Sequence, residues 1–561
     1  MRTTSFKSRA FALVSTTALL ATLVVAAPAN AAATDPVCNG ATPVQTCTGK
    51  TSDGALYEMR VPATFDGTMT IWSHGFGTNT NIPAGLLPIF PLGNPIDPRP
   101  QIAPAGDTAL IKYLTDKGVA VIGSGFSTQA WNLDEAVKTN VELIGIFKAK
   151  FPTTKKVVAW GYSMGGGITQ ALAEQHPELL SAAGVMNPVD SWNAQSKYLV
   201  DMLWLMKTWF DPSIKLTGYA AGVAGDMQMI QDLGKYLLIL QSLQAGVATG
   251  AWPTTSSASG KALQAAGIPS RSALLMIGRL SGISSTSSSF DGVTGPAGAA
   301  ATAWPLAYAP ALGTLENIAG VLGYALLGAR DMQTKMGGIS FDNSKTDYAK
   351  QLSDEDRTVY NAGLSGNTAI AGMLQTLNPL NPDAPRIKGE AAAVAKSAST
   401  MYQNTGKIKV PTVMMIGQHD PVEPAGIVQR ISDLYEEDFA AEKDAAKKAA
   451  QKSGAYKAPA RKLQVLWATT PKAWSKFNAD GTPISITGTP GTGHTNFSTA
   501  HYKTFIDTML SAATNGVLPW NGAQLSKVYK AKNLVIDRDT LYPWMKYYTC
   551  LLYTSPSPRD S

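Results

Sequence analysis

The sequence predicts an α/β fold: a mostly parallel sheet flanked by helices that carries a large, mainly helical insertion. Residues 56–190 alternate short β-branched runs with stretches of helical spacing, which is typical of parallel strands joined by helices. Strand character disappears over residues 191–404 and returns over residues 410–470. The insertion therefore interrupts one sheet and does not form a second one.

The expected strands are apolar runs that end in turn residues. The first two lie close together in the sequence, and we expect them to be neighbours in the sheet. Residues 134–151 place Val137, Val141 and Ile144 at helical spacing, and another helix follows Ser163. In chain order, the strands are expected at residues 56–62, 68–75, 118–125, 156–163, 182–190, 410–420, 463–470 and 482–494.

The insertion is rich in alanine, glycine, serine and aromatic residues, and serine-rich connectors separate its apolar helical stretches. Its aromatic side chains could line an apolar substrate pocket, but we expect most of them to fill the core of the insertion. They are Trp204, Trp209, Tyr219, Trp252, Trp304, Tyr308 and Tyr324. The later helix at residues 434–452 mixes both charge signs, which indicates a solvated face.

The first 31 residues have the pattern of a secretory signal: a basic start, an apolar run and the small-x-small sequence Ala29-Asn30-Ala31. We therefore expect a secreted protein, extracellular or periplasmic. No later stretch looks apolar and long enough to span a bilayer, so stable membrane insertion is not expected. Removing three signal-segment cations from the net charge of +7 leaves about +4, which is too diffuse to indicate a nucleic-acid partner.

Cys38 and Cys47 are expected to form a local disulfide in an exported protein. The third cysteine begins CLLYTSPSPRDS, which matches the translation of a transposase-type sequencing adapter, so we expect this tail not to be native. The expected division is 1–31 signal peptide, 32–190 first part of the core, 191–404 lid insertion, 405–549 second part of the core and 550–561 adapter translation.

The candidate nucleophile is Ser163, in Gly161-Tyr162-Ser163-Met164-Gly165. This is the G-x-S-x-G pattern, and it lies between an expected strand and an expected helix. The small flanking residues permit a strained turn on which the serine hydroxyl stands clear of the sheet. A purely structural turn is the alternative interpretation.

The candidate base is His494, on a glycine- and threonine-rich loop before a helix. The candidate acid is Asp420, directly after an apolar strand, with Glu423 as a nearby rival. An imidazole can accept the serine proton, and a carboxylate can orient the imidazole and stabilise its charged form. His176, His419 and His501 are expected to be structural or surface residues.

The amides of Met164 and Phe76 are the candidate oxyanion donors. Met164 directly follows the nucleophile. Phe76 lies in the His74-Gly75-Phe76-Gly77 turn, where glycine lets the backbone bend sharply. We expect His74 to brace this loop and to take no part in proton transfer.

Four segments in this order, HGFG, GYSMGGG, GQHDPVEP and GTGH, resemble the α/β-hydrolase superfamily. The resemblance covers about residues 55–190 and 405–515. It implies the α/β-hydrolase fold with a lid insertion, and a secreted serine esterase-like enzyme that forms an acyl-enzyme on Ser163. It also implies neither a metal nor an organic cofactor.

The substrate is expected to be a moderately apolar, small-molecule carboxylic ester. A serine peptidase of the same fold, or an inactive binding protein on this scaffold, are the alternatives. The acidic cluster at residues 354–356 could bind a peptide amine but better fits a helix start. Asp342, Asn343 and Asp347 lack the full calcium-loop pattern and better fit a capped turn. Oligomeric state is not predicted.

Overall fold

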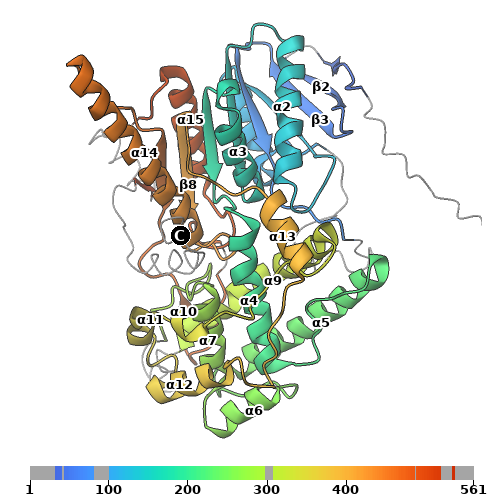
Figure 1. Ribbon diagram of the computed structural model, residues 1–561, viewed down its shortest axis with the longest axis vertical. Coiled ribbons are helices and arrows are strands. Elements are labelled where there is room, and N and C mark those ends of the chain that lie inside the picture. The colour runs from blue at the N-terminus through green and yellow to red at the C-terminus, as the bar shows by residue number, and fades with distance from the viewer. Residues whose placement is uncertain are drawn as a thin grey trace, which may run out of the picture.

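The computed structural model describes residues 32–40, 43–80, 100–296, 308–486, 488–519 and 534–536. The expected signal peptide, the expected adapter tail and Trp304 lie outside these ranges. The sheet and its helices form one end of the molecule, and the helical insertion forms the other (Figure 1).

The central sheet has ten strands, in the order β1-β2-β3-β5-β4-β6-β7-β8-β9-β12. The strands from β5 to β9 run parallel, whereas β1, β2, β3 and β12 join their neighbours antiparallel. A mostly parallel sheet is therefore confirmed. The strands are β1 Val37–Asn39, β2 Val44–Lys50, β3 Leu56–Pro62, β4 Thr68–Ser73, β5 Ala120–Ser124, β6 Lys156–Tyr162, β7 Ala182–Met186, β8 Thr412–Gly417, β9 Leu463–Ala468 and β12 Leu534–Ile536.

Two strand predictions are wrong. The strands β3 and β4 are not neighbours, because β5 crosses over and pairs with both of them. The expected strand at residues 482–494 is only β11 (Pro483–Ile484), which pairs with β10 (Lys476–Phe477) in a hairpin outside the main sheet. Three glycines with positive φ, Gly488, Gly491 and Gly493, turn the chain after β11 into a loop.

Helices cover both faces of the sheet, and alternate residues of the buried strands supply the two cores. In β6, Val157 and Ala159 face one side, where α2 and α3 pack, while Val158 and Trp160 face the other, where α1 and α15 pack. The core helices are α1 Thr108–Thr115, α2 Leu133–Lys150, α3 Met164–Gln175, α14 Ala425–Ser453 and α15 Thr499–Asn515, with 3-10 turns η2 Pro104–Gly106 and η3 Pro177–Leu179.

The helical insertion leaves the sheet after β7 and returns at β8. Its two ends meet in an antiparallel bridge between Ser191 and Gln403, and Asn404 Nδ2 donates to the carbonyl of Asp190 at 3.0 Å. The insertion helices lie at the carboxyl ends of the parallel strands (Figure 1). They are α4 Trp192–Phe210, α5 Gly222–Gly246, α6 Ala258–Ala265, α7 Ser270–Ser281, α9 Tyr308–Met336, α10 Tyr348–Gln351, α11 Asp354–Val359, α12 Gly366–Thr376 and α13 Ala391–Thr400.

The insertion has a hydrophobic core of its own. Trp204, Trp209 and Tyr219 are buried in it and Trp252 packs against it, as expected for most of its aromatic residues. The helix α9 is long and apolar enough to cross a membrane by length and composition, contrary to the sequence-based expectation. Two-thirds of its most apolar window, 67%, is buried inside the protein, which is typical of a core helix.

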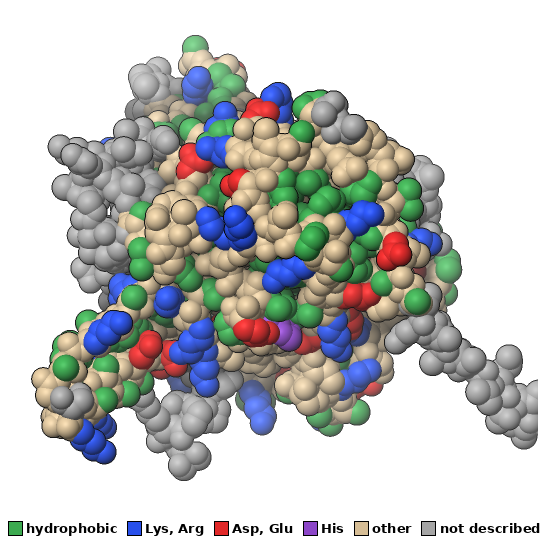
Figure 2. Space-filling model, turned by 90° about the horizontal axis from the view of Figure 1, so that it is seen from above, with side chains coloured by type: hydrophobic (Ala, Val, Ile, Leu, Met, Phe, Trp, Pro, Cys, Tyr) green, Lys and Arg blue, Asp and Glu red, His purple; other side chains and the backbone are tan. Residues whose placement is uncertain are grey.

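The disulfide between Cys38 and Cys47 is present, and it joins β1 to β2 at the edge of the sheet. On the end of the molecule opposite the insertion, Lys and Arg side chains are interspersed with Asp and Glu (Figure 2).

Candidate active site

Ser163 lies between β6 and α3 in a conformation that few non-glycine residues adopt. Its φ and ψ are 55° and −130°. The chain can turn there because the neighbouring positions lack side chains: a Cβ on Gly165 would lie 2.0 Å from the carbonyl oxygen of Ser73. Ser163 N donates to Met186 O at 3.0 Å, which anchors the turn to the next strand. The G-x-S-x-G segment therefore forms the tight strand-to-helix turn that its pattern predicts.

The structure brings Ser163, His494 and Asp420 together. His494 Nε2 lies 2.9 Å from Ser163 Oγ, and His494 Nδ1 lies 3.0 Å and 3.1 Å from the two oxygens of Asp420. Because the ionised carboxylate can only accept, Nδ1 carries the proton and Nε2 is free to accept from the serine hydroxyl. Serine, base and acid thus form one hydrogen-bonded chain.

Asp420 is buried, and several donors hold its carboxylate in place. Val422 N and Glu423 N donate to Oδ1 at 2.8 and 3.0 Å, while Thr495 N and Asn187 Nδ2 donate to Oδ2. Burial alone would raise the pKa of Asp420, but its electrostatic interaction and hydrogen bond with His494 and the backbone hydrogen bonds from Glu423 and Thr495 outweigh it, so the pKa lies below its ordinary value. The carboxylate is therefore ionised and fixed opposite the imidazole.

The neighbours that hold the acid are themselves constrained. Asn187 and Thr495 both have positive φ, 36° and 50°, like Ser163. Asn187 also accepts from Gly417 N at 2.7 Å, which ties the end of β7 to the end of β8. His419 N donates to Gly491 O at 2.8 Å and joins the acid loop to the base loop. Unusual backbone conformations thus gather at this site, as they do at functional sites generally.

The turn that follows β4 lies against the nucleophile. A Cβ on Gly75 would lie 3.5 Å from Ser163 Cβ, and both Phe76 and Met164 line the pocket that contains Ser163. Met164 is the first residue of α3, where backbone N–H groups have no partner within the helix. His74 braces the turn: its Nδ1–H donates to Gly75 O at 2.8 Å, and its ring lies 4.5 Å from that of Phe126. Burial lowers the pKa of His74, so the ring is neutral.

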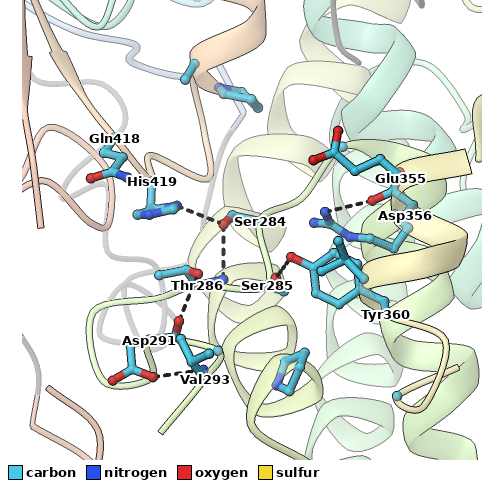
Figure 3. Close-up of a pocket in the computed structure, with 18 of the residues that line it drawn as sticks. Ser284, Ser285, Thr286, Asp291, Val293, Glu355, Asp356, Tyr360, Gln418 and His419 are labelled. Atoms are coloured by element: carbon cyan, nitrogen blue, oxygen red, sulfur yellow. Dashed lines mark hydrogen bonds and ion pairs between the residues drawn. The ribbon is translucent and has the colours of Figure 1, made fainter. Parts of the chain in front are cut away.

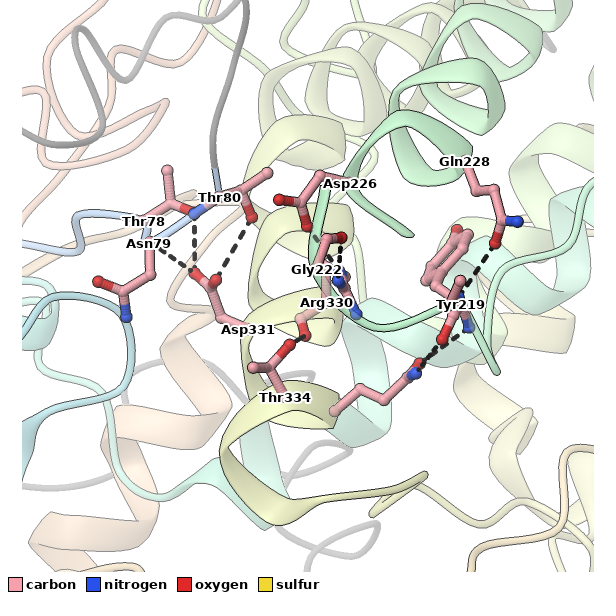
Figure 4. Close-up of polar contacts among 12 residues, drawn as sticks. Thr78, Asn79, Thr80, Tyr219, Gly222, Asp226, Gln228, Arg330, Asp331 and Thr334 are labelled. Carbon is pink, nitrogen blue, oxygen red and sulfur yellow. Dashed lines mark hydrogen bonds and ion pairs between the residues drawn. The ribbon is translucent and has the colours of Figure 1, made fainter. Parts of the chain in front are cut away.

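The helix α9 of the insertion fastens this turn. The carboxylate of Asp331 accepts from Thr78 Oγ1 at 2.8 Å, from Thr80 Oγ1 at 3.3 Å and from Asn79 N at 3.4 Å (Figure 4). Burial raises the pKa of Asp331 to about 7, although the hydrogen bonds oppose the shift. Sequence reasoning missed Asp331, because nothing in the sequence links a helix of the insertion to a turn 250 residues earlier.

The insertion also covers Ser163. Only 2% of Ser163 is exposed, and the adjoining cavity of about 30 Å³ is lined by insertion residues that include Trp192, Gln195 and Tyr324. The Tyr324 ring lies 5.5 Å from the ring of His494. Of the insertion's aromatic residues, both Tyr324 and Trp192 therefore lie at the site.

A larger cavity of about 450 Å³ lies on the other side of the acid loop (Figure 3). Asp420 and Pro424 line this cavity, whereas Val422 and Glu423 line the small one at Ser163. His419 faces it and contacts Ser284 Oγ at 3.2 Å. Burial and then the charge of Arg279 lower the pKa of His419 to about 3, which fits the expected structural role.

The other expected non-catalytic groups have local partners. His176 contacts Glu178 at the surface, and His501 caps α15 together with Ser498. Asp347 caps α10, and the cluster at residues 354–356 opens α11 behind the cap Ser353. Among the described residues, no group of three or more His, Cys, Asp or Glu side chains is arranged to hold a metal ion.

Comparisons with known proteins bear on the fold. Residues 120–214 match the family described as alpha/beta hydrolase fold. No curated protein matches the chain. Among solved structures, it is similar to an esterase from Aspergillus oryzae, at 13% identity and a TM-score of 0.32 over 85% of this chain and 81% of that one. It is also similar to feruloyl esterase B from the same organism, at 11% identity and a TM-score of 0.33 over 85% of this chain and 81% of that one. A third similar structure is tannin acyl hydrolase from Aspergillus niger, at 13% identity and a TM-score of 0.33 over 87% of this chain and 83% of that one.

Proposed function

We propose that this chain, whose fold is that of the α/β hydrolases, is a secreted serine hydrolase that cleaves carboxylic esters through an acyl-enzyme on Ser163. The observation that carries the proposal is the hydrogen-bonded chain from Ser163 Oγ through His494 to the buried Asp420. A serine on a strained turn, with a base at 2.9 Å and an ionised acid behind that base, is equipped for nucleophilic attack.

In the proposed reaction, Ser163 Oγ attacks the ester carbonyl while His494 Nε2 accepts its proton. His494 then gives that proton to the leaving alcohol, and water attacks the acyl-enzyme by the reverse sequence. Asp420 keeps Nδ1 protonated throughout and stabilises the imidazolium. The amides of Met164 and Phe76 are the proposed donors to the oxyanion, and the N-terminal end of α3 adds its dipole.

The proposed lid, residues 191–404, excludes water from this reaction. Its helices leave 2% of Ser163 exposed, and low local polarity strengthens hydrogen bonds to a developing oxyanion. The access of a substrate then requires the lid to move. The secretion proposal is supported by the Cys38–Cys47 disulfide, since disulfides persist in oxidising compartments.

The test uses a fluorophosphonate probe and a panel of nitrophenyl esters. The probe should label Ser163, and Ser163→Ala should abolish the labelling and lower ester turnover by several orders of magnitude while thermal unfolding stays unchanged. Ser399→Ala, at an exposed serine of α13, is the matched control and should behave like the wild type. Near-normal turnover by folded Ser163→Ala would refute the mechanism, and faster cleavage of aminoacyl nitroanilides than of esters would indicate a peptidase.

A further inference from the structure

Two buried oxygen atoms beside the nucleophile contact no polar group of the described chain. They are Oε2 of Glu423 and Oε1 of Gln195, and the two residues are 1% and 4% exposed. Both line the small cavity that contains Ser163, whose other walls are largely apolar. Leaving a buried polar atom without a hydrogen bond costs roughly 1–3 kcal/mol, so such atoms usually have a partner, either protein, water or ligand.

The orientation of the Gln195 amide follows from its surroundings. One of its terminal atoms lies 2.9 Å from the carbonyl oxygen of Val422, which can only accept. That atom is therefore Nε2, the donor. Nε2 also lies 2.8 Å from Glu423 Oε1 and 2.9 Å from the hydroxyl oxygen of Tyr198, so its two N–H groups are shared among three acceptors. Gln195 Oε1 is left as an acceptor without a partner among the described residues, on a side chain that lines the cavity.

The protonation of Glu423 follows in the same way. Burial raises the pKa of this carboxyl well above its ordinary range, and the negative charges of Asp420 and Asp190 raise it further against the hydrogen bond from Gln195. The neutral, protonated form of the group is therefore favoured. Because Oε1 lies within hydrogen-bond distance of an N–H of Gln195, the acid proton is placed on Oε2, the unpartnered oxygen of a residue that lines the cavity.

We propose that Glu423 and Gln195 form a polar subsite that binds a hydroxyl group of the substrate, with Glu423 donating to that oxygen and Gln195 accepting its proton. This inference rests on the proposed ester hydrolysis. A hydroxyl is one donor and one acceptor, which matches the two free positions. The cavity of about 30 Å³ admits a group the size of one water molecule, so the hydroxyl is carried on a short chain close to the reacting carbonyl.

The hydroxyl could be carried by the acyl portion or by the alcohol portion of the ester, and the experiment separates these sources. The acyl arm compares nitrophenyl 3-hydroxybutanoate with nitrophenyl butanoate. The alcohol arm compares 2-hydroxyethyl butanoate with propyl butanoate. Two neutral hydrogen bonds in a buried site predict a preference in kcat/KM of about tenfold or more for the hydroxylated ester in one arm. Equal rates within twofold in both arms would overturn the subsite.

Variants test which residues produce the preference. Glu423→Leu and Gln195→Leu should each reduce the ratio of the two kcat/KM values to near one. Glu423→Gln keeps a donor and an acceptor and should retain most of the ratio. Gln351→Leu removes another buried glutamine whose Oε1 has no partner among the described residues, but away from this cavity, so its ratio should equal that of the wild type.

Thermal unfolding of each variant shows whether it folds. If a leucine variant does not fold, the ratio of kcat/KM values measured on the wild type still tests the subsite. A folded Glu423→Leu variant that keeps the full preference would overturn the assignment. If the wild type shows no preference in either arm but hydrolyses plain butanoate and its Ser163 is labelled, only the subsite inference fails. If neither ester is cleaved and Ser163 is not labelled, the proposed function itself fails.

Discussion

Asp331 gives a sharp test of how the insertion serves the site. The Asp331→Ala variant removes the carboxylate that accepts from Thr78, Asn79 and Thr80 and leaves these donors without it. Losing an acceptor for buried donors costs roughly 1–3 kcal/mol, which corresponds to about 5- to 150-fold in the population of the correctly placed turn. That turn carries the proposed oxyanion donor Phe76, and one such donor contributes about 10²–10³ in kcat. We therefore expect kcat to fall by one to two orders of magnitude.

The assay is steady-state hydrolysis of a short-chain nitrophenyl ester, with thermal unfolding of the same samples. Because the oxyanion forms only in the transition state, kcat should fall much more than KM rises. Asp331→Asn keeps an acceptor of the same size and should lose less activity. Thr334→Ala changes the same helix one turn further on, where Thr334 Oγ1 donates to Arg330 O, and is the control. A folded Asp331→Ala variant with kcat within twofold of wild type would refute the reasoning.

Four further outcomes are expected. Because the folded pKa of Asp331 is raised to about 7, its contribution to stability is complete below the unfolded pKa of about 4 and is lost as pH rises through 7. The stability of the wild type relative to Asp331→Asn, measured by denaturant unfolding, should therefore fall between pH 4 and 7; a constant difference contradicts this. Asp420→Asn should lower kcat by about 10⁴-fold with a normal unfolding midpoint, since the imidazole loses its correct tautomer; near-wild-type kcat would exclude Asp420 as the acid. Replacing Cys38 and Cys47 by alanine should lower the free energy of unfolding by up to roughly 3 kcal/mol and leave kcat unchanged, and a loss of kcat would show that this edge of the sheet supports the site. Soluble short-chain esters should react far faster than a solid polyester film, and film hydrolysis at a comparable rate would show that the insertion does not cover Ser163 in solution.

The parallel part of the sheet could be predicted because each strand is a short apolar run that ends in turn residues. The chain order of the candidate site residues could be predicted for the same reason. Ser163 and Asp420 each follow such a run, and the carboxyl ends of parallel strands meet at one edge of the sheet, whereas His494 lies on the glycine-rich loop after the β10–β11 hairpin. Spacing alone could not distinguish Asp420 from Glu423 as the partner of the base. The structure separates them, because Asp420 contacts His494 while Glu423 turns to Gln195.

What the sequence could not reveal depends on contacts between distant segments. The edge strand β1 and its neighbour β2 lack a strong apolar pattern, and the other edge strand, β12, is an apolar run of only three residues. The position of β5 between β3 and β4 depends on how the chain crosses from one strand to the next, and the local hydrophobic pattern carries no information about strand order. Gln195 and Asp331 have roles only through partners more than two hundred residues away, Glu423 and the turn at Thr78.

One helix of the insertion, α9, carries both Asp331 and Tyr324, and these two side chains reach opposite parts of the site. Asp331 holds the turn that follows β4, and Tyr324 lies against the ring of His494. Any displacement of α9 large enough to admit a substrate therefore withdraws support from the oxyanion turn and from the base in the same movement. In the proposed mechanism, a molecule with α9 displaced would lack both contacts during bond cleavage. This arrangement also means that shortening the insertion to widen access would remove part of the catalytic apparatus itself.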